Sequence, residues 1–192
     1  MCGKAAVDGL THPICQTRRS IDGCFIIMDY IGSVKKLIYV FKYKPFVTDT
    51  QHVIGELFYE GLIQKEAAMR ILGEKHDVLL MPIPLHKNKL RQRGYNHAAI
   101  LTKQLAKRLG VSFCDCLIRE KETKIQAGLS KKERKENIHD AFRVTKNVIL
   151  KEKTVFIIDD IVTSGATFVE AARMLKKAGA KAVYGLAFSG EY

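Results

Sequence analysis

The C-terminal part of the chain follows a pattern that few folds accommodate. A strand rich in apolar residues, Lys153–Ile158, leads into a polar stretch at Asp159–Thr167, and a helical pattern then covers Phe168–Ala178. Gly179 ends that helix, and a second apolar strand is expected at Ala180–Phe188. A strand, a helix and a strand in this order form a βαβ unit, whose two strands run parallel.

Strand and helix patterns alternate over most of the remaining chain as well. Strands are expected at Cys24–Tyr30, Asp77–Pro84, Cys116–Arg119 and, at a sheet edge, Ala141–Val144. Helices are expected at Val34–Tyr43, Thr50–Ile71, Tyr95–Leu109 and Lys131–Asn137. Between the second strand and the third helix, His86–Gly94 reads as a basic, polar loop. The alternation predicts an α/β protein with a largely parallel sheet flanked by helices.

Length and charge limit both the architecture and the partner. The 192 residues suit one domain, and 47% hydrophobic with 27% charged residues excludes a disordered or collagen-like chain. The net charge of +12 favours a polyanionic partner, which includes nucleic acid, a phosphorylated small molecule or an anionic membrane face. Trp is absent and aromatic residues make up 8%, which argues against a surface of several stacking aromatics.

Cysteine usage and hydropathy predict a cytoplasmic protein with reduced thiols. The number of cysteines is five, which is odd, and the chain is too long to need a disulfide scaffold. The N-terminus has no long apolar segment typical of a signal peptide, and the longest apolar runs, such as Val78–Pro84, are too short to span a membrane. No transmembrane segment is therefore expected.

The junction between the strand and the helix of the βαβ unit predicts a phosphate site. The N-terminus of the helix offers unpaired backbone N–H groups, Thr and Ser add hydroxyl donors, and Gly165 allows close approach of the backbone. The sequence there has no Walker A pattern. Asp159 and Asp160 stand beside this loop, and carboxylates accept hydrogen bonds from vicinal hydroxyls. Together these residues predict a site for a ribose 5-phosphate.

The segment VFIIDDIVTSGAT (Val155–Thr167) resembles the motif by which type I phosphoribosyltransferases bind 5-phosphoribosyl 1-pyrophosphate (PRPP). Four further segments narrow this resemblance to the ComF family of phosphoribosyltransferase-like competence proteins. They are MPIPLHK (Met81–Lys87), RQRGYNH (Arg91–His97), QAGLSKKERKEN (Gln126–Asn137) and AFRV (Ala141–Val144). The resemblance covers nearly the whole chain and implies a type I phosphoribosyltransferase fold with a small N-terminal extension that contains cysteine.

The resemblance also implies roles for individual residues. Asp159 and Asp160 would bind the ribose 2- and 3-hydroxyls, and Arg91 and Arg93 would act on the pyrophosphate from a flexible catalytic loop; these four would form the catalytic set. The PRPP-binding set would comprise these two aspartates with Leu85, His86, Lys87, Thr163, Ser164, Gly165, Ala166 and Thr167. Mg²⁺ would join the pyrophosphate and ribose oxygens and would be held mainly by the substrate.

The family commonly begins with a small cysteine-rich zinc module, so residues 1–20 are interpreted as a remnant of a zinc-ribbon-like module. Cys2, His12 and Cys15 would be its zinc ligands, although a structural zinc site uses four. Residues 21–192 would form the phosphoribosyltransferase-like domain, and within it residues 21–73 are free to serve as a hood over the acceptor.

Three functions remain open from the sequence. The chain could transfer the phosphoribosyl group of PRPP to an unknown acceptor, act as an accessory competence factor that binds single-stranded DNA during uptake, or sense PRPP without turnover. Lys87, Lys89, Arg91 and Arg93 place part of the positive charge at the expected pyrophosphate site. The charges in Lys35–Lys44 and Lys131–Lys135 are expected to lie away from it, which leaves a nucleic-acid partner as an alternative.

Overall fold

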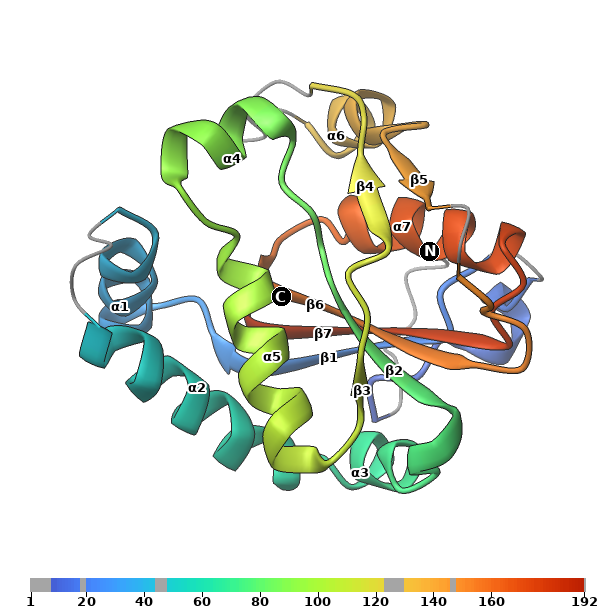
Figure 1. Ribbon diagram of the computed structural model, residues 1–192, viewed down its shortest axis with the longest axis horizontal. Coiled ribbons are helices and arrows are strands. Elements are labelled where there is room, and N and C mark those ends of the chain that lie inside the picture. The colour runs from blue at the N-terminus through green and yellow to red at the C-terminus, as the bar shows by residue number, and fades with distance from the viewer. Residues whose placement is uncertain (1–7, 18–19, 44–47, 123–129, 146–147, 192) are drawn as a thin grey trace.

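The computed structural model describes residues 8–17, 20–43, 48–122, 130–145 and 148–191. Its centre is a parallel sheet of five strands in the order β1-β7-β6-β2-β3 (Figure 1). The strands are β1 (Gly23–Asp29), β2 (Val78–Pro82), β3 (Ser112–Phe113), β6 (Thr154–Val162) and β7 (Ala182–Gly190). The predicted α/β class with a parallel sheet is confirmed.

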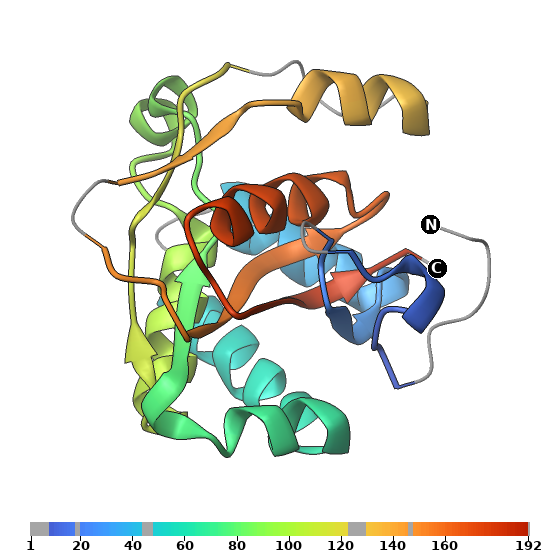
Figure 2. The same ribbon diagram turned by 90° about the vertical axis from the view of Figure 1, so that its right-hand side faces the viewer.

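Helices cover both faces of this sheet. One face carries α1 (Gly32–Tyr43), α2 (Thr48–Ile63), α3 (Glu66–Leu72) and α5 (His97–Leu109). The other face carries α7 (Ala166–Lys177), and Figure 2 shows α7 between the sheet and α6 (Lys131–Ile138). A separate antiparallel ribbon, β4 (Leu117–Arg119) with β5 (Phe142–Val144), lies on the same side as α6.

Strand β6 shows why the sheet needs two layers of helices. Successive side chains of a strand point to opposite faces, so a run of apolar residues buries both. Phe156 and Ile158 belong to the core under α2 and α5, whereas Val155 and Ile157 belong to the core under α7. The unbroken apolar run therefore places β6 in the middle of the sheet.

Strand β6 is also longer than the expected Lys153–Ile158. It continues through both aspartates, and Val162 still pairs with Gly190 of β7. A Cβ atom on Gly190 would lie 2.7 Å from Ile26 and 2.9 Å from Val162, so only glycine leaves room for this close pairing. As a result the strand, rather than a loop, holds Asp159 and Asp160.

Two other expectations need correction. The helix expected over Thr50–Ile71 is two helices, because the chain breaks at Gln64–Lys65 before α3 packs Ala67 and Ala68 into the core. The expected loop His86–Gly94 contains α4 (Lys87–Arg93), whose N-terminus is capped by the His86 side chain, which accepts a hydrogen bond from the N–H of Asn88. Gly94, at φ 81°, ends α4 in the left-handed conformation that glycine adopts readily.

The short remaining elements are the 3₁₀ helices η1 (Pro13–Cys15) and η2 (Lys75–Asp77). An isolated antiparallel bridge joins Leu10 to Gly23 at the start of β1. Among the helices within the described ranges, none combines the length and the apolar character that crossing a membrane requires.

The strand order places a crevice beside β2 and β6. From β2 the chain passes through α5 to β3 on one side, and from β6 it passes through α7 to β7 on the other. The connections leave these two adjacent strands in opposite directions, so a crevice opens outside their carboxyl ends. Ligands of open α/β sheets bind at such a point.

Candidate functional site

A cavity of about 220 Å³ lies at the carboxyl ends of β2 and β6. Several elements that are distant in sequence contribute side chains to it. Its charged lining residues are Lys42 of α1, Lys89 and Arg93 of α4, Arg119 of β4, and Asp159 and Asp160 of β6. Four cations therefore face two carboxylates, and the cavity carries an excess of positive charge that suits an anionic ligand.

The two aspartates lie side by side in a poorly hydrated position. The N–H of Asp160 donates to Oδ1 of Asp159 at 2.9 Å, and the Asp160 side chain is buried. Burial, followed by the charge of Asp160, raises the pKa of the Asp159 carboxyl well above its usual value, while the ammonium of Lys42 opposes the rise. Each carboxyl is thus held where hydrogen bonds from ligand hydroxyls would be strong.

The positively charged side chains that line the cavity repel one another. Burial, and then the charges of Arg119 and Arg93, lowers the pKa of Lys89. Burial also lowers the pKa of Arg119, although Asp159 opposes that effect. A bound polyanion would relieve both the burial of these charges and their mutual repulsion.

A smaller hollow of about 30 Å³ adjoins the cavity, with Asp159 in the lining of both. It is formed by the segment from Thr163 to Phe168, where the chain enters α7. Gly165 has φ 70° and begins the helix without a side-chain cap, and a Cβ there would meet nothing within 4 Å. The backbone N–H groups of the first turn of α7 therefore border an open hollow, as a phosphate site requires.

The residues predicted from the sequence do not all reach the cavity. Leu85, Arg93 and Thr167 line it together with the two aspartates, and the rest of the Thr163–Thr167 loop lines the adjoining hollow. His86 is buried and caps α4. Lys87 and Arg91 are exposed on α4, and neither is among the lining residues.

The structure adds four titratable side chains that the sequence-based set lacked: Lys42, Lys89, His97 and Arg119. The expectation that the charges of Lys35–Lys44 lie away from the site is wrong for Lys42. Its ammonium forms an ion pair with Asp160 at 3.0 Å. Lys89 belongs to the basic cluster noted in the sequence, whereas no sequence signal links Lys42 or Arg119 to the aspartates, because only the tertiary fold brings them together.

His97 begins α5 at the cavity wall and is almost fully buried. Burial lowers the pKa of its imidazole, with Asp160 opposing, so the ring is neutral near pH 7. Its Nε2 atom has no hydrogen-bond partner within the described part of the protein. A neutral imidazole combines a hydrogen-bond donor with an acceptor, so the ring could offer either to a ligand.

The zinc prediction remains a prediction. Cys2 lies outside the described residues, while His12 immediately precedes η1 and Cys15 is its last residue. No cluster of three or more His, Cys, Asp or Glu residues suitable for a metal ion occurs in the ranges that the structure describes. The Cys24 thiol in β1 is half-buried, and desolvation raises its pKa to about 12, which disfavours the thiolate that binds zinc.

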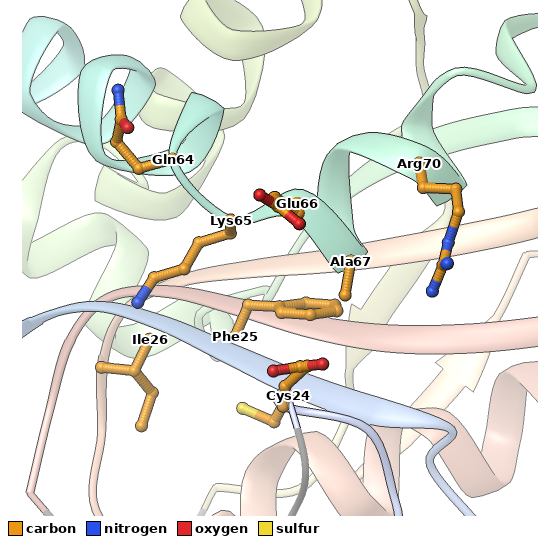
Figure 3. Close-up of a pocket in the computed structure, with 10 residues that line it drawn as sticks. Cys24, Phe25, Ile26, Gln64, Lys65, Glu66, Ala67 and Arg70 are labelled. Carbon is orange, nitrogen blue, oxygen red and sulfur yellow. The ribbon is translucent and has the colours of Figure 1, made fainter.

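A larger cavity, of about 840 Å³, lies elsewhere (Figure 3). Its floor is the amino-terminal half of the edge strand β1, including Cys24 and Phe25, and the corner between α2 and α3 covers it. Figure 3 shows Lys65 and Arg70 extending from that corner toward β1. With Asp8 and Glu66 also in the lining, positive and negative side chains balance in this cavity. The first turn of α3 borders this cavity, but the described residues of its lining include no pair of adjacent carboxylates like Asp159 and Asp160.

The sequence similarity to known proteins includes segments that form the 220 Å³ cavity and the adjoining hollow. The family model described as "Phosphoribosyl transferase domain" matches residues 96–188, which include β6, the loop and α7. Competence protein F of Haemophilus influenzae is 33% identical over 174 residues, which are 88% of this chain and 73% of that protein. The chain belongs to the ComF family of phosphoribosyltransferase-like proteins.

Another relative is DNA utilization protein YhgH of Escherichia coli, which is 28% identical over 158 residues, or 82% of this chain and 67% of that one. The similarity to solved structures is more distant. A hypoxanthine phosphoribosyltransferase from Staphylococcus aureus has a TM-score of 0.42 and 13% identity, over 71% of this chain and 62% of that one.

Proposed function

We propose that this ComF-family protein binds PRPP at the cavity of about 220 Å³ beside β2 and β6. There it would transfer the phosphoribosyl group to an acceptor, with release of pyrophosphate. The observation that carries the proposal is the course of β6. This strand brings Asp159 and Asp160 to a cationic cavity and continues directly into the glycine-containing N-terminus of α7.

The arrangement suggests one orientation of the ligand. The 5-phosphate would accept hydrogen bonds from the Thr163–Thr167 loop and the first turn of α7. The ribose hydroxyls would donate to Asp159 and Asp160, and the pyrophosphate would lie among the cations of α4 and β4. This orientation gives the 5-phosphate hydrogen-bond donors, the hydroxyls carboxylate acceptors and the pyrophosphate a cluster of cations.

The residues present also fit a Mg²⁺ ion that is held mainly by the substrate, as expected from the sequence. Mg²⁺ binds oxygen, which Asp159 and Asp160 supply, but Lys42 already engages Asp160. Two neighbouring carboxylates, one of them paired, cannot complete an octahedral site, so the pyrophosphate and ribose would supply most of the ligands. The ion would then neutralise part of the charge on the pyrophosphate.

In the transfer, the bond between C1 of the ribose and the pyrophosphate oxygen breaks, and the acceptor forms a bond to C1 and loses a proton. Charge moves from the sugar onto the leaving pyrophosphate. Arg93 and Arg119 line the cavity where that charge develops and would stabilise it. Most of the rate enhancement would come from positioning and from these fixed charges.

Pyrophosphate release tests the proposal. The protein is incubated with Mg²⁺ and PRPP and with a panel of nucleobases and amines, and Asp159→Asn serves as the inactive variant. Release that depends on one acceptor and is lost in the variant is the expected result. If calorimetry shows PRPP binding but no acceptor gives release, the transfer proposal fails, and a PRPP sensor is the function that remains.

One observation favours contact with single-stranded DNA as a second candidate function. Helix α1 exposes Tyr39 and Tyr43, whose ring centroids are 5.0 Å apart, although the composition argued against stacking aromatics. The guanidinium of Arg93 lies 5.4 Å above the Tyr43 ring, and Lys35 stands on the same helix. Exposed rings beside cations form a surface on which unpaired bases stack. The names of the relatives, competence and DNA utilization proteins, agree with this candidate.

Fluorescence anisotropy with a labelled oligothymidine tests DNA binding. The logarithm of the affinity should fall with the logarithm of the salt concentration, with a slope of about −0.7 per phosphate contacted. Replacing both tyrosines by alanine should weaken binding about tenfold or more, whereas Val53→Ala, at an exposed position on α2, should not. A slope near zero, or equal affinities of the two variants, would exclude this surface.

A further inference from the structure

Lys42 is the residue through which α1 reaches the candidate PRPP site. It belongs to the last turn of the helix, and its ammonium lies 3.0 Å from Oδ2 of Asp160. Both side chains are mostly shielded from water, with 20% of the Lys42 side chain and 8% of the Asp160 side chain exposed. This contact is therefore well enough shielded to influence what the carboxylate can bind.

The ion pair is favourable in the unliganded protein. Burial alone would disfavour the charge of Lys42, but Asp160 and then Asp159 outweigh burial and hold the pKa of Lys42 above its usual value. The lysine thereby neutralises part of the charge that two adjacent carboxylates bring to a cavity. The ammonium also takes up an oxygen that a ribose hydroxyl would use.

Ligand binding changes this balance. A ribose that donates hydroxyl hydrogen bonds to the aspartates competes with Lys42 for Asp160. A pyrophosphate in the same cavity offers the displaced ammonium a new anionic partner, because Lys89, Arg93 and Lys42 line the same space. Lysine suits such a move, since its ammonium is a compact charge on a flexible chain of four carbons.

We propose that Lys42 alternates between two partners: it pairs with Asp160 in the empty site and binds the pyrophosphate of PRPP in the occupied site. Its transfer frees Asp160 for the ribose hydroxyls and attaches α1 to the ligand. This inference rests on the proposed function, because it requires PRPP in this cavity. It assigns Lys42 a contact with the ligand and makes the site selective for a ribose phosphate that also carries pyrophosphate.

Calorimetry with two ligands, ribose 5-phosphate and PRPP with Mg²⁺, tests the proposal. Only PRPP has the pyrophosphate, whereas both ligands have the hydroxyls and the 5-phosphate. In Lys42→Met, ribose 5-phosphate should bind equally well or more tightly, because its competitor is gone. PRPP should lose affinity, so that the ratio of the two dissociation constants shifts by about tenfold, as expected for a hydrogen bond to a charged group.

Two further variants serve as controls. Lys36→Met removes the same charge from an exposed position of α1 and should leave the ratio unchanged. Lys42→Arg keeps a cation at the site and should keep the ratio within about threefold of the wild-type value. Thermal unfolding of each variant verifies that it is folded.

The possible outcomes separate this inference from the proposed function. If Lys42→Met weakens both ligands equally, Lys42 is only a structural residue, and if it tightens both equally, Lys42 only blocks the site; either result overturns the inference. If the wild-type protein binds neither ligand, the proposed function fails first. A shift in the ratio that Lys36→Met does not reproduce supports the alternation of Lys42.

Discussion

The cavities of about 840 Å³ and about 220 Å³ differ in chemistry as well as in size, and the smaller of these two has the features of a site for an anionic ligand. The larger, of about 840 Å³, lies against the amino-terminal half of the edge strand β1, and its acidic and basic side chains balance. The smaller, of about 220 Å³, lies at the carboxyl ends of two central strands and holds four cations against two carboxylates.

The difference teaches that position in the sheet and unmatched charge identify the site better than volume. The larger cavity is bordered by the first turn of α3, but its charges are matched and it lies away from the carboxyl ends of the central strands. In the smaller cavity the fold holds like charges close together, such as Asp159 beside Asp160, at the cost of shifted pKa values. A ligand with complementary charges would relieve that cost.

The largest expected effect follows from removing one carboxylate. At about pH 9, where the Asp159 carboxyl is ionised despite its raised pKa, Asp159→Asn should weaken binding of ribose 5-phosphate by about 100-fold, because the hydroxyls lose a charged acceptor. Glu66→Gln makes the same change of group in the larger cavity and should have no effect. Isothermal titration calorimetry measures both. Equal losses in the two variants would contradict the assignment of the ligand to the smaller cavity.

A smaller effect is expected from removing a guanidinium. Arg93→Ala should weaken binding of PRPP with Mg²⁺ by about tenfold, because the pyrophosphate loses a cation. Ribose 5-phosphate, which lacks the pyrophosphate, should bind almost as before. The matched control is Arg70→Ala in the larger cavity. The same titrations serve, and an unchanged affinity for PRPP in Arg93→Ala would place the pyrophosphate elsewhere.

The raised pKa of Asp159 predicts opposite pH trends for binding and stability. Ribose hydroxyls donate best to an ionised carboxylate, so the affinity for ribose 5-phosphate should rise several-fold between about pH 5 and 9 as Asp159 loses its proton. The other charges that face this carboxyl are Asp160, Lys42 and Arg119.

Stability of the free protein should change in the other direction. A carboxyl whose pKa is higher in the folded than in the unfolded protein stabilises the fold below its unfolded value, near 3.8, and loses that contribution as the pH rises through the folded value. Titrations and thermal melts of Asp159→Asn should both show flatter pH profiles. Identical profiles for wild type and variant would show that another group titrates.

The smallest effect is expected at the helix entrance. Gly165→Ala places a Cβ in the left-handed conformation, and although no atom lies within 4 Å, the backbone strain should lower the free energy of unfolding by about 1 kcal/mol. Gly165→Asn should lose less, because Asn tolerates that conformation. Chemical denaturation measures both. Equal stability of the alanine variant and the wild type would show that the loop adopts another conformation.

Local patterns in the sequence predicted the centre of the fold. The apolar run of β6 identified a buried parallel strand, and the two acids with the following Thr, Ser and Gly residues identified the junction with α7. Hydrophobic periodicity could not locate α4, which buries no residue, because its stability comes from the His86 cap and the Gly94 end. It also missed β3, whose two residues are too few to show a period.

The sequence predicted only those site residues that lie close together along the chain. Asp159, Asp160 and the loop follow one another along the chain, so the motif contains them. Lys42 and Arg119 come from elements far away in sequence, and their approach to the aspartates depends on how α1 and the β4–β5 ribbon pack. Sequence spacing carries no information on such contacts, so the sequence could not indicate that Lys42 of α1 reaches the site.

A crystal structure of the protein soaked with PRPP and Mg²⁺ tests the central claim most directly. The account predicts the 5-phosphate at the Thr163–Thr167 loop, the ribose hydroxyls at Asp159 and Asp160, and the pyrophosphate within the cationic cavity. Lys42 should then contact the pyrophosphate and no longer pair with Asp160. PRPP bound in the larger cavity beside β1, or a smaller cavity that stays empty while its surroundings are accessible to the soak, would contradict the account.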